Sequence, residues 1–157
     1  MSPRAFVTAV IVGAVALGGC SRQPPAERWT TMTARAHREA DRRLDAGDAS
    51  GARARLLALV DAQKAHAGES AERRLALQDT YFRLARLAIG AHEPRQAIAY
   101  ADAGLAYGTA PHLFVANLLV ARGAALEAAG DARAAAADYQ RALAINETLL
   151  GQATELQ

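Results

Sequence analysis

The sequence predicts an all-α protein, and three observations carry this prediction. Alanine, leucine and arginine, which favour helices, dominate the chain, whereas β-branched residues are scarce after residue 20. Apolar residues recur at helical spacing almost continuously from Thr31 onward. The tetrapeptide AGDA occurs at residues 46–49 and again at residues 129–132, and this composition is typical of a turn between helices. The 157 residues leave room for one domain with a modest core.

The first 19 residues are predicted to be a signal peptide rather than part of the fold. Arg4 gives the chain a positive start, and an apolar stretch runs from Ala5 to Leu17. This stretch is too short for a transmembrane helix, because crossing the hydrocarbon core takes about 20 residues.

Cys20 follows the leader and is the single cysteine of the chain, which excludes an internal disulfide. The residues LGGC at positions 17–20 resemble a bacterial lipobox. The resemblance implies cleavage before Cys20 and lipidation of this residue. Because Ser21 follows rather than an aspartate, it also implies an outer-membrane location facing the periplasm. The alternative is an ordinary secretory signal with an accidental cysteine.

Residues 20–30 are predicted to form a flexible tether between the anchor and the domain. The stretch is polar, and Pro24 and Pro25 cannot occupy a helix interior. A helical domain is expected over residues 31–157.

Turn signals divide this domain into six helical segments, which pair as three hairpins over about residues 33–66, 78–108 and 116–150. Asp48 and Asp131 suit helix N-caps, and Pro94 and Pro111 suit first helical turns. The turn signals are Gly47-Asp48, Gly68, His92-Glu93-Pro94, residues 108–111 and Gly130-Asp131.

The hairpins carry the trace of an internal repeat. The AGDA sites lie 83 residues apart, and a third turn, AHEP at residues 91–94, lies between them. Small residues at matching positions of the three hairpins would let the helices approach closely, with larger ones beside them. The matching sets are Ala40, Ala85 and Gly123; Ala52, Ala97 and Ala135; Leu56, Ala101 and Tyr139; and Val60, Leu105 and Leu143.

With this pattern the chain resembles the tetratricopeptide repeat family. GAALEAAGDARAAAADYQRALAIN, residues 123–146, is a close match, and residues 84–108 are a fair one. The first hairpin is weaker, because Glu39 and Arg43 stand where apolar residues are usual. The resemblance implies three helix-turn-helix hairpins stacked as a short right-handed α-solenoid, whose groove binds a protein or peptide partner.

The resemblance also implies which side chains line that groove, since they come from the first helix of each hairpin. Those carried over are His37, Asp41, Asp79, Phe82, Arg86, Ile89, Asn117, Val120 and Glu127. Phe82 and Arg86 stand four residues apart, so they would be neighbours on one helix face. Packing of Phe82 on the first hairpin is the alternative. The paired lysine and asparagine that hold a carboxylate in chaperone-binding members are missing.

The expected function is therefore a lipoprotein adaptor that holds a protein near the membrane. Small lipoproteins of this repeat type resemble assembly factors of envelope machines such as pili and secretion systems. That likeness is one of fold alone.

A second function class follows from the charge distribution. Residues 22–86 carry 13 basic and 9 acidic residues, whereas residues 87–157 carry 4 basic and 7 acidic ones. The basic half could lie on anionic lipid or cell wall through Arg35, Arg38, Arg42 and Arg43. The competing interpretation is a solvated helix face, since Glu39, Asp41 and Asp45 interleave with these arginines. The net charge of +2 is too small to imply a nucleic-acid partner.

No enzyme, metal site or cofactor is predicted. The four histidines are far apart in sequence and lack partners at metal-ligand or base–nucleophile spacing. A catalytic alternative would need folding to bring His37 close to Asp79 or Arg86, and a separation above about 8 Å would remove it.

The sequence allows two interpretations of the last segment. Leu149, Leu150 and Leu156 remain apolar beyond the third hairpin. The final helix is expected to continue past Gly151, a glycine being tolerated near a helix end at about 1 kcal/mol. Alternatively, a partner covers an open edge there.

Overall fold

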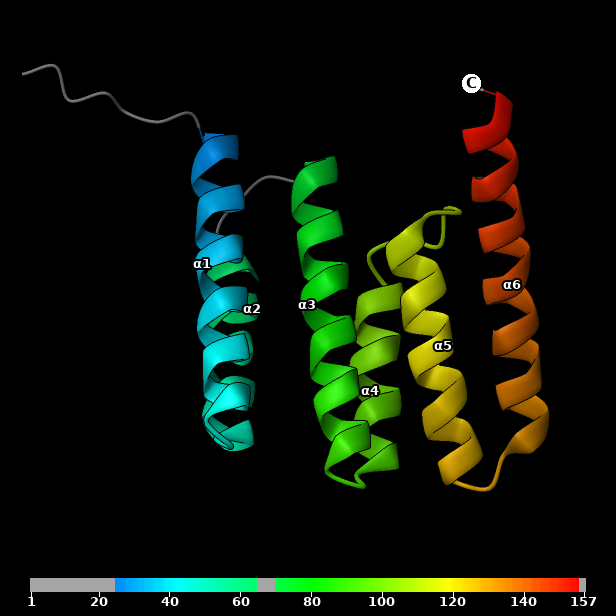
Figure 1. Cartoon of the computed structure of the whole chain (residues 1–157), viewed down its shortest axis with the longest axis horizontal. Helices are drawn as coiled ribbons and strands as arrows, with labels where there is room; N and C mark the ends of the chain where they lie inside the picture. The colour runs from blue at the N-terminus through cyan, green and yellow to red at the C-terminus, as the bar shows by residue number, and fades with distance from the viewer. Residues whose placement is uncertain (1–24, 65–69, 156–157) are drawn as a thin grey trace, which may run out of the picture.

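The computed structural model describes residues 25–64 and 70–155, which form six α-helices (Figure 1). The all-α prediction is confirmed for this part of the chain, in which no strand occurs. The predicted signal peptide at residues 1–19, the lipidation site Cys20, the start of the tether and the turn signal Gly68 lie outside the described residues. The helices are α1 (Pro25–Asp45), α2 (Ala49–Lys64), α3 (Ala71–Gly90), α4 (Pro94–Leu105), α5 (Leu113–Ala128) and α6 (Ala132–Glu155).

The first helix begins earlier than the sequence predicts. The tether is expected to reach residue 30, whereas α1 already starts at Pro25. A proline fits the first helical position, because the N–H that it lacks would have no partner inside the helix there. The proline predicted to exclude a helix therefore begins one.

Three of the turns share one backbone conformation. Gly47, His92 and Gly130 occupy the same place in the α1–α2, α3–α4 and α5–α6 turns, with φ of 78°, 58° and 90°. In each turn their N–H bonds to the carbonyl three residues back, and the next N–H bonds to the carbonyl five residues back. Both AGDA copies and AHEP therefore form equivalent turns. His92 adopts a left-handed conformation that the other two turns give to glycine.

The predicted caps are confirmed at both AGDA sites. The Asp48 carboxylate accepts a hydrogen bond from the Gly51 N–H at 2.8 Å, and that of Asp131 accepts one from the Ala134 N–H at 3.0 Å.

The prolines of the other turns differ in their outcome. Pro94 occupies the first position of α4, as expected. The prediction for Pro111 is wrong, because α5 begins only at Leu113. His112, with its extended backbone, takes the cap position between them.

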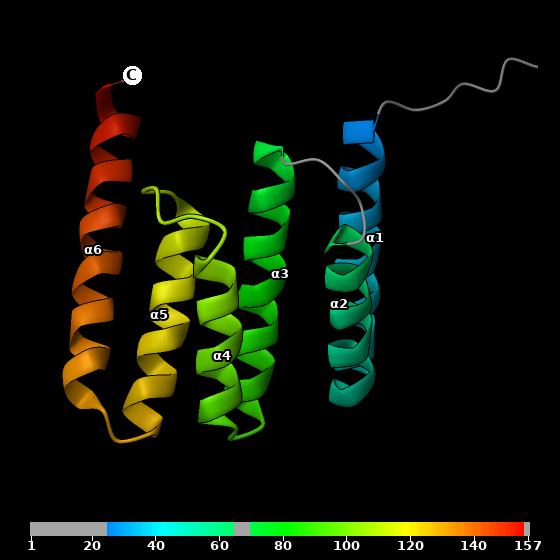
Figure 2. The ribbon, with the colours of Figure 1, turned by 180° about the vertical axis from the view of Figure 1, so that it is seen from behind.

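The helices pack in two layers. Each helix contacts the next one, and consecutive helices run in opposite directions (Figures 1 and 2). α3 also contacts both α1 and α5, whereas the backbones of α2, α4 and α6 approach one another nowhere in the described residues. The odd-numbered helices therefore form one closely spaced layer, and the even-numbered helices form a second, wider one.

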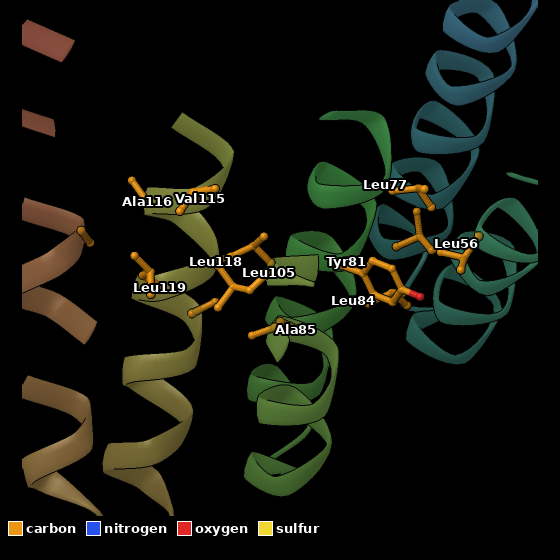
Figure 3. Packing of buried hydrophobic residues seen from close by; sticks show 14 of the residues in the cluster. Leu56, Leu77, Tyr81, Leu84, Ala85, Leu105, Val115, Ala116, Leu118 and Leu119 are labelled. Atoms are coloured by element: carbon orange, nitrogen blue, oxygen red, sulfur yellow. The ribbon is translucent and has the colours of Figure 1, made fainter. Parts of the chain in front are cut away.

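Leucines fill the space between these helices. Leu56 and Leu77 lie where α2 meets α3, and Leu105 and Leu118 meet between α4 and α5 (Figure 3). Leu118 is fully buried, and burying a leucine side chain contributes roughly 1.5–3 kcal/mol. The core therefore runs through the whole stack rather than lying at one place.

Close helix approach depends on small residues, as the repeat register predicts. A Cβ added at Gly123 would lie 2.7 Å from the Tyr139 ring, so the α5–α6 contact has no room for a larger residue. Gly104 plays the same part against Leu118, at 2.8 Å, although the register did not single it out. The predicted small residues are all buried: Ala40, Ala52, Ala85, Ala97, Gly123 and Ala135.

The register fails at one core position. Val60 and Leu105 are buried as predicted, but Leu143 is 59% exposed. It lies on α6, which no further helix of the described chain covers. α6 itself continues past Gly151 to Glu155, as expected.

A charged cluster ties the last three helices together. Arg122 of α5 donates from Nε and Nη2 to the buried Asp138 of α6, at 2.7 and 2.8 Å. Its Nη1 donates to Asp102 of α4 at 2.6 Å. Hydrogen bonding to Asp138 raises the pKa of Arg122 above its usual value, so the guanidinium stays charged at any relevant pH.

Candidate binding surface

The residues predicted for partner binding all lie on the closely spaced layer of α1, α3 and α5. Asp41, Arg86, Val120 and Glu127 are exposed, Asp79, Phe82, Ile89 and Asn117 are half-buried, and His37 is buried. We use the term odd-helix face for the four exposed members, the half-buried Phe82 and Asn117, and the exposed Leu44. This face comprises Asp41, Leu44, Phe82, Arg86, Asn117, Val120 and Glu127.

His37 does not belong to this face, contrary to the prediction. It is only 7% exposed and lies in the contact between α1 and α3. Its Nδ1 lies 3.2 Å from an Asp79 carboxylate oxygen, and its Nε2 lies 3.1 Å from the Thr80 hydroxyl. The neighbouring helix has thus covered a side chain that helical spacing alone placed toward a partner.

The surroundings of His37 favour its neutral form. Burial lowers the pKa of His37, and the positive charge of Arg83 lowers it further. The carboxylates of Asp79 and Asp41 act in the opposite direction, and Arg55 adds a smaller lowering effect. The net result is a pKa below the ordinary value, so His37 is neutral at pH 7.

The geometry bears directly on the catalytic alternative. His37 and Asp79 are in contact, so the distance between them does not exclude the catalytic alternative. However, the Thr80 hydroxyl is fully buried and donates to the Ala76 carbonyl oxygen at 2.7 Å. A nucleophile must reach the substrate, and this hydroxyl has no exposed surface. The cluster is therefore suited to holding α1 against α3.

Arg83, which is not among the predicted site residues, connects the two acidic residues of this region. Its Nη1 donates to the Asp41 carboxylate at 2.9 Å, and its Nε lies 3.5 Å from the carboxylate of Asp79. The spacing of four residues between Asp79 and Arg83 was the available signal. As a result, Arg83 compensates the negative charges of both Asp41 and Asp79.

Phe82 and Arg86 are neighbours, as their spacing predicts. The Arg86 guanidinium lies 5.8 Å from the centre of the Phe82 ring, within the range of a cation–π contact. Phe82 is half-buried and packs against the core, so the ring that contacts Arg86 is only partly in solvent. Arg86 is exposed, and no carboxylate of the described residues lies within 4.0 Å of it.

A cavity opens beside Arg86, between α1 and α3. Its volume is about 280 Å³. Apolar side chains line its floor, and charged side chains lie at its rim. Of all its lining residues, Asp41, Leu44 and Arg86 belong to the odd-helix face. The lining residues are Ala40, Asp41, Leu44, Leu56, Arg83, Arg86 and Leu87.

The remaining predicted residues differ in what they present. Val120 is 44% exposed, so it presents an apolar side chain to solvent. Asn117, one turn before it, is half-buried. Glu127 accepts a hydrogen bond from the Tyr139 hydroxyl at 3.1 Å. Ile89 is half-buried and packs against the core.

Sequence reasoning missed one further residue of this stripe. Leu113 precedes Asn117 by one helical turn and is one of the most exposed large apolar residues of the described chain. The signal was available, because Leu113 stands four residues before Asn117 and such residues share a helix face.

Two kinds of site are absent from the described part of the chain, a metal centre and a membrane-spanning helix. No three side chains among its histidines, aspartates and glutamates come together as a metal site would require. None of its helices has the length and apolar character needed to cross a bilayer.

Comparison of the chain with protein-family models, with curated proteins and with solved structures finds no match. The proposal of a function therefore rests on the residues of this chain.

Proposed function

We propose that the protein is a small adaptor whose odd-helix face binds a segment of a protein partner, and that it performs no catalysis. The three helical pairs would stack as a short right-handed solenoid of the tetratricopeptide repeat type. Two features support this arrangement. The α1–α2, α3–α4 and α5–α6 turns are equivalent, and the odd-numbered helices lie closer together than the even-numbered ones. A stack of helical pairs curves toward the side on which its helices are more closely spaced.

One observation carries the proposal. The cavity between α1 and α3 is lined by the exposed Leu44 and Arg86, and Val120 of α5 is a further exposed apolar side chain of the odd-numbered helices. An arginine beside an aromatic ring and exposed apolar side chains is the composition found at the centre of protein interfaces.

The proposed location rests on the lipobox-like residues 17–20. A lipid on Cys20 would hold the domain at the outer membrane on its periplasmic side, where an envelope machine such as a pilus or a secretion system would supply the partner. Labelling with a fatty-acid analogue tests this directly, since label should be lost in Cys20→Ala. Label retained in that variant would refute the anchor.

The alternative of a lipid- or wall-binding surface is less well supported. Of the four arginines on which it depends, Arg42 and Arg43 form ion pairs with Glu39, and Arg43 forms another with Asp48. Charges that are already paired within the chain attract an anionic surface weakly.

Site-specific photocrosslinking tests the adaptor function. A photoreactive phenylalanine analogue at Val120 reports on the odd-helix face, and the same analogue at Gln96, an exposed position on α4, is the matched control. In native membranes we expect one crosslinked protein from position 120, identified by mass spectrometry, and none from position 96. Equal crosslinking from both positions, or crosslinking from position 96 alone, would refute the proposal.

A further inference from the structure

The cavity between α1 and α3 combines an apolar floor with an excess of positive charge. Leu56 is buried in its floor, and Leu44, which is 39% exposed, forms part of its rim. Its charged lining residues are Asp41, Arg83 and Arg86. Two arginines and one aspartate give the lining a net charge of +1.

That excess charge belongs to Arg86. Asp41 is held by Arg83 at 2.9 Å, so these two charges compensate each other. Arg86 has no carboxylate within 4.0 Å in the described part of the chain. A basic ligand would meet Arg86 without an opposite charge, whereas an acidic ligand would supply the missing one.

Arg86 is also held in position for such a ligand. Its guanidinium rests over the Phe82 ring at 5.8 Å, and Phe82 is fixed by its packing against the core. Stacking on an aromatic ring leaves the N–H donors at the guanidinium edge available for a carboxylate. A side chain that is already ordered loses less entropy when it binds.

The size of the cavity limits what can enter it. At about 280 Å³ it is smaller than the usual pockets for drug-sized ligands, which begin at about 300 Å³. One apolar side chain of a peptide is the better match for an opening of this size with a leucine-lined floor.

We propose that this cavity takes an aliphatic side chain of the partner segment, and that Arg86 binds the carboxylate of an acidic residue next to it. This deepens the adaptor function and rests on it. It adds that the partner is acidic at the contact point and presents a leucine-like residue there.

Fluorescence anisotropy with defined peptides tests this on the full chain in detergent. The probes are labelled Gly-Ser peptides that carry Glu-Leu-Glu, Lys-Leu-Lys or Glu-Ala-Glu at their centre. We expect the Glu-Leu-Glu peptide to bind at least about tenfold more tightly than the other two, since a charge-assisted hydrogen bond and a buried leucine each contribute that much. No binding of any peptide, or equal binding of the acidic and basic ones, would overturn the proposal.

Variants assign the effect to the cavity. Arg86→Glu should reverse the preference, so that the Lys-Leu-Lys peptide binds best, and Leu44→Ala should reduce the advantage of leucine over alanine. Both positions are exposed, so the fold should persist. Arg95→Glu, at an exposed arginine on α4, is the matched control and should change nothing. An unchanged preference in Arg86→Glu, or the same reversal in Arg95→Glu, would overturn the proposal.

The two proposals fail in different ways. If position 120 still crosslinks one partner while the peptide preference is absent, the adaptor function stands and the cavity has been assigned wrongly. Loss of the specific crosslink would count against the adaptor function itself.

Discussion

Replacing Arg122 by alanine should destabilise the protein severely, because the substitution strands a buried carboxylate. Asp138 is 4% exposed and receives two of the three hydrogen bonds that Arg122 donates, at 2.7 and 2.8 Å. Removing one partner of a buried ion pair costs about 3–5 kcal/mol. The third bond, to the exposed Asp102, adds at most about 1 kcal/mol. A total unfolding free energy of about 5–15 kcal/mol is normal for a domain, so Arg122→Ala would remove a large part of it.

Urea unfolding followed by far-ultraviolet circular dichroism measures this loss. Asp102→Ala is the matched control, because it removes a carboxylate from the same arginine but leaves no buried charge. It should cost less than about 1 kcal/mol. Replacing both buried partners, as Arg122→Met with Asp138→Leu, should recover most of the stability, since a well-packed apolar pair needs no compensating charge. The reasoning is refuted if Arg122→Ala costs no more than Asp102→Ala.

Three further predictions concern single residues. His92→Gly should raise the unfolding free energy by about 1 kcal/mol in the same urea assay, because glycine adopts the left-handed conformation without a steric penalty; an unchanged or lower value would contradict this. The pKa of His37 is lower in the folded protein than in the unfolded chain. The contribution of His37 to the free energy of unfolding is therefore complete above about pH 6.5 and falls as the pH drops below that value. A urea series from about pH 7.5 to about pH 5 should show this fall, which His37→Gln should reduce; equal pH dependence in both proteins would exclude His37 as its cause. Leu143→Gln should change stability by no more than about 0.5 kcal/mol, whereas Leu118→Ala should cost about 2–5 kcal/mol, and comparable losses would show that α6 is covered.

Local chemistry made the helix boundaries at the two AGDA turns predictable, whereas the starts of α1 and α5 were placed wrongly. The glycine–aspartate pairs at the AGDA sites determine a left-handed residue followed by a cap, and both features occur where the sequence places them. His92 shows the limit of this reasoning. The AHEP turn was found from its spacing, but nothing local indicates that a histidine takes the conformation of a glycine.

Side-chain exposure was harder to predict, because it depends on neighbours that are distant in sequence. Helical spacing places His37 and Asp41 on one stripe of α1, yet α3 covers the first and leaves the second in solvent. Leu143 has the spacing of a core residue and is exposed, because the described chain ends its stack at α6. Arg83 pairs with Asp79 within α3 and with Asp41 across the α1–α3 contact. Spacing within one helix could reveal only the first of these two pairs.

The central claim is that the odd-helix face holds a protein partner, and a comparative pull-down tests it most directly. Native membranes are crosslinked, and the protein is recovered either unchanged or as the double variant Phe82→Ala/Arg86→Ala, with Arg95→Ala as the control. The account predicts that one envelope protein is recovered with the unchanged chain and with the control, and is lost with the double variant. Recovery of the same protein in equal amount with the double variant would contradict the account and move the contact to another surface of the molecule.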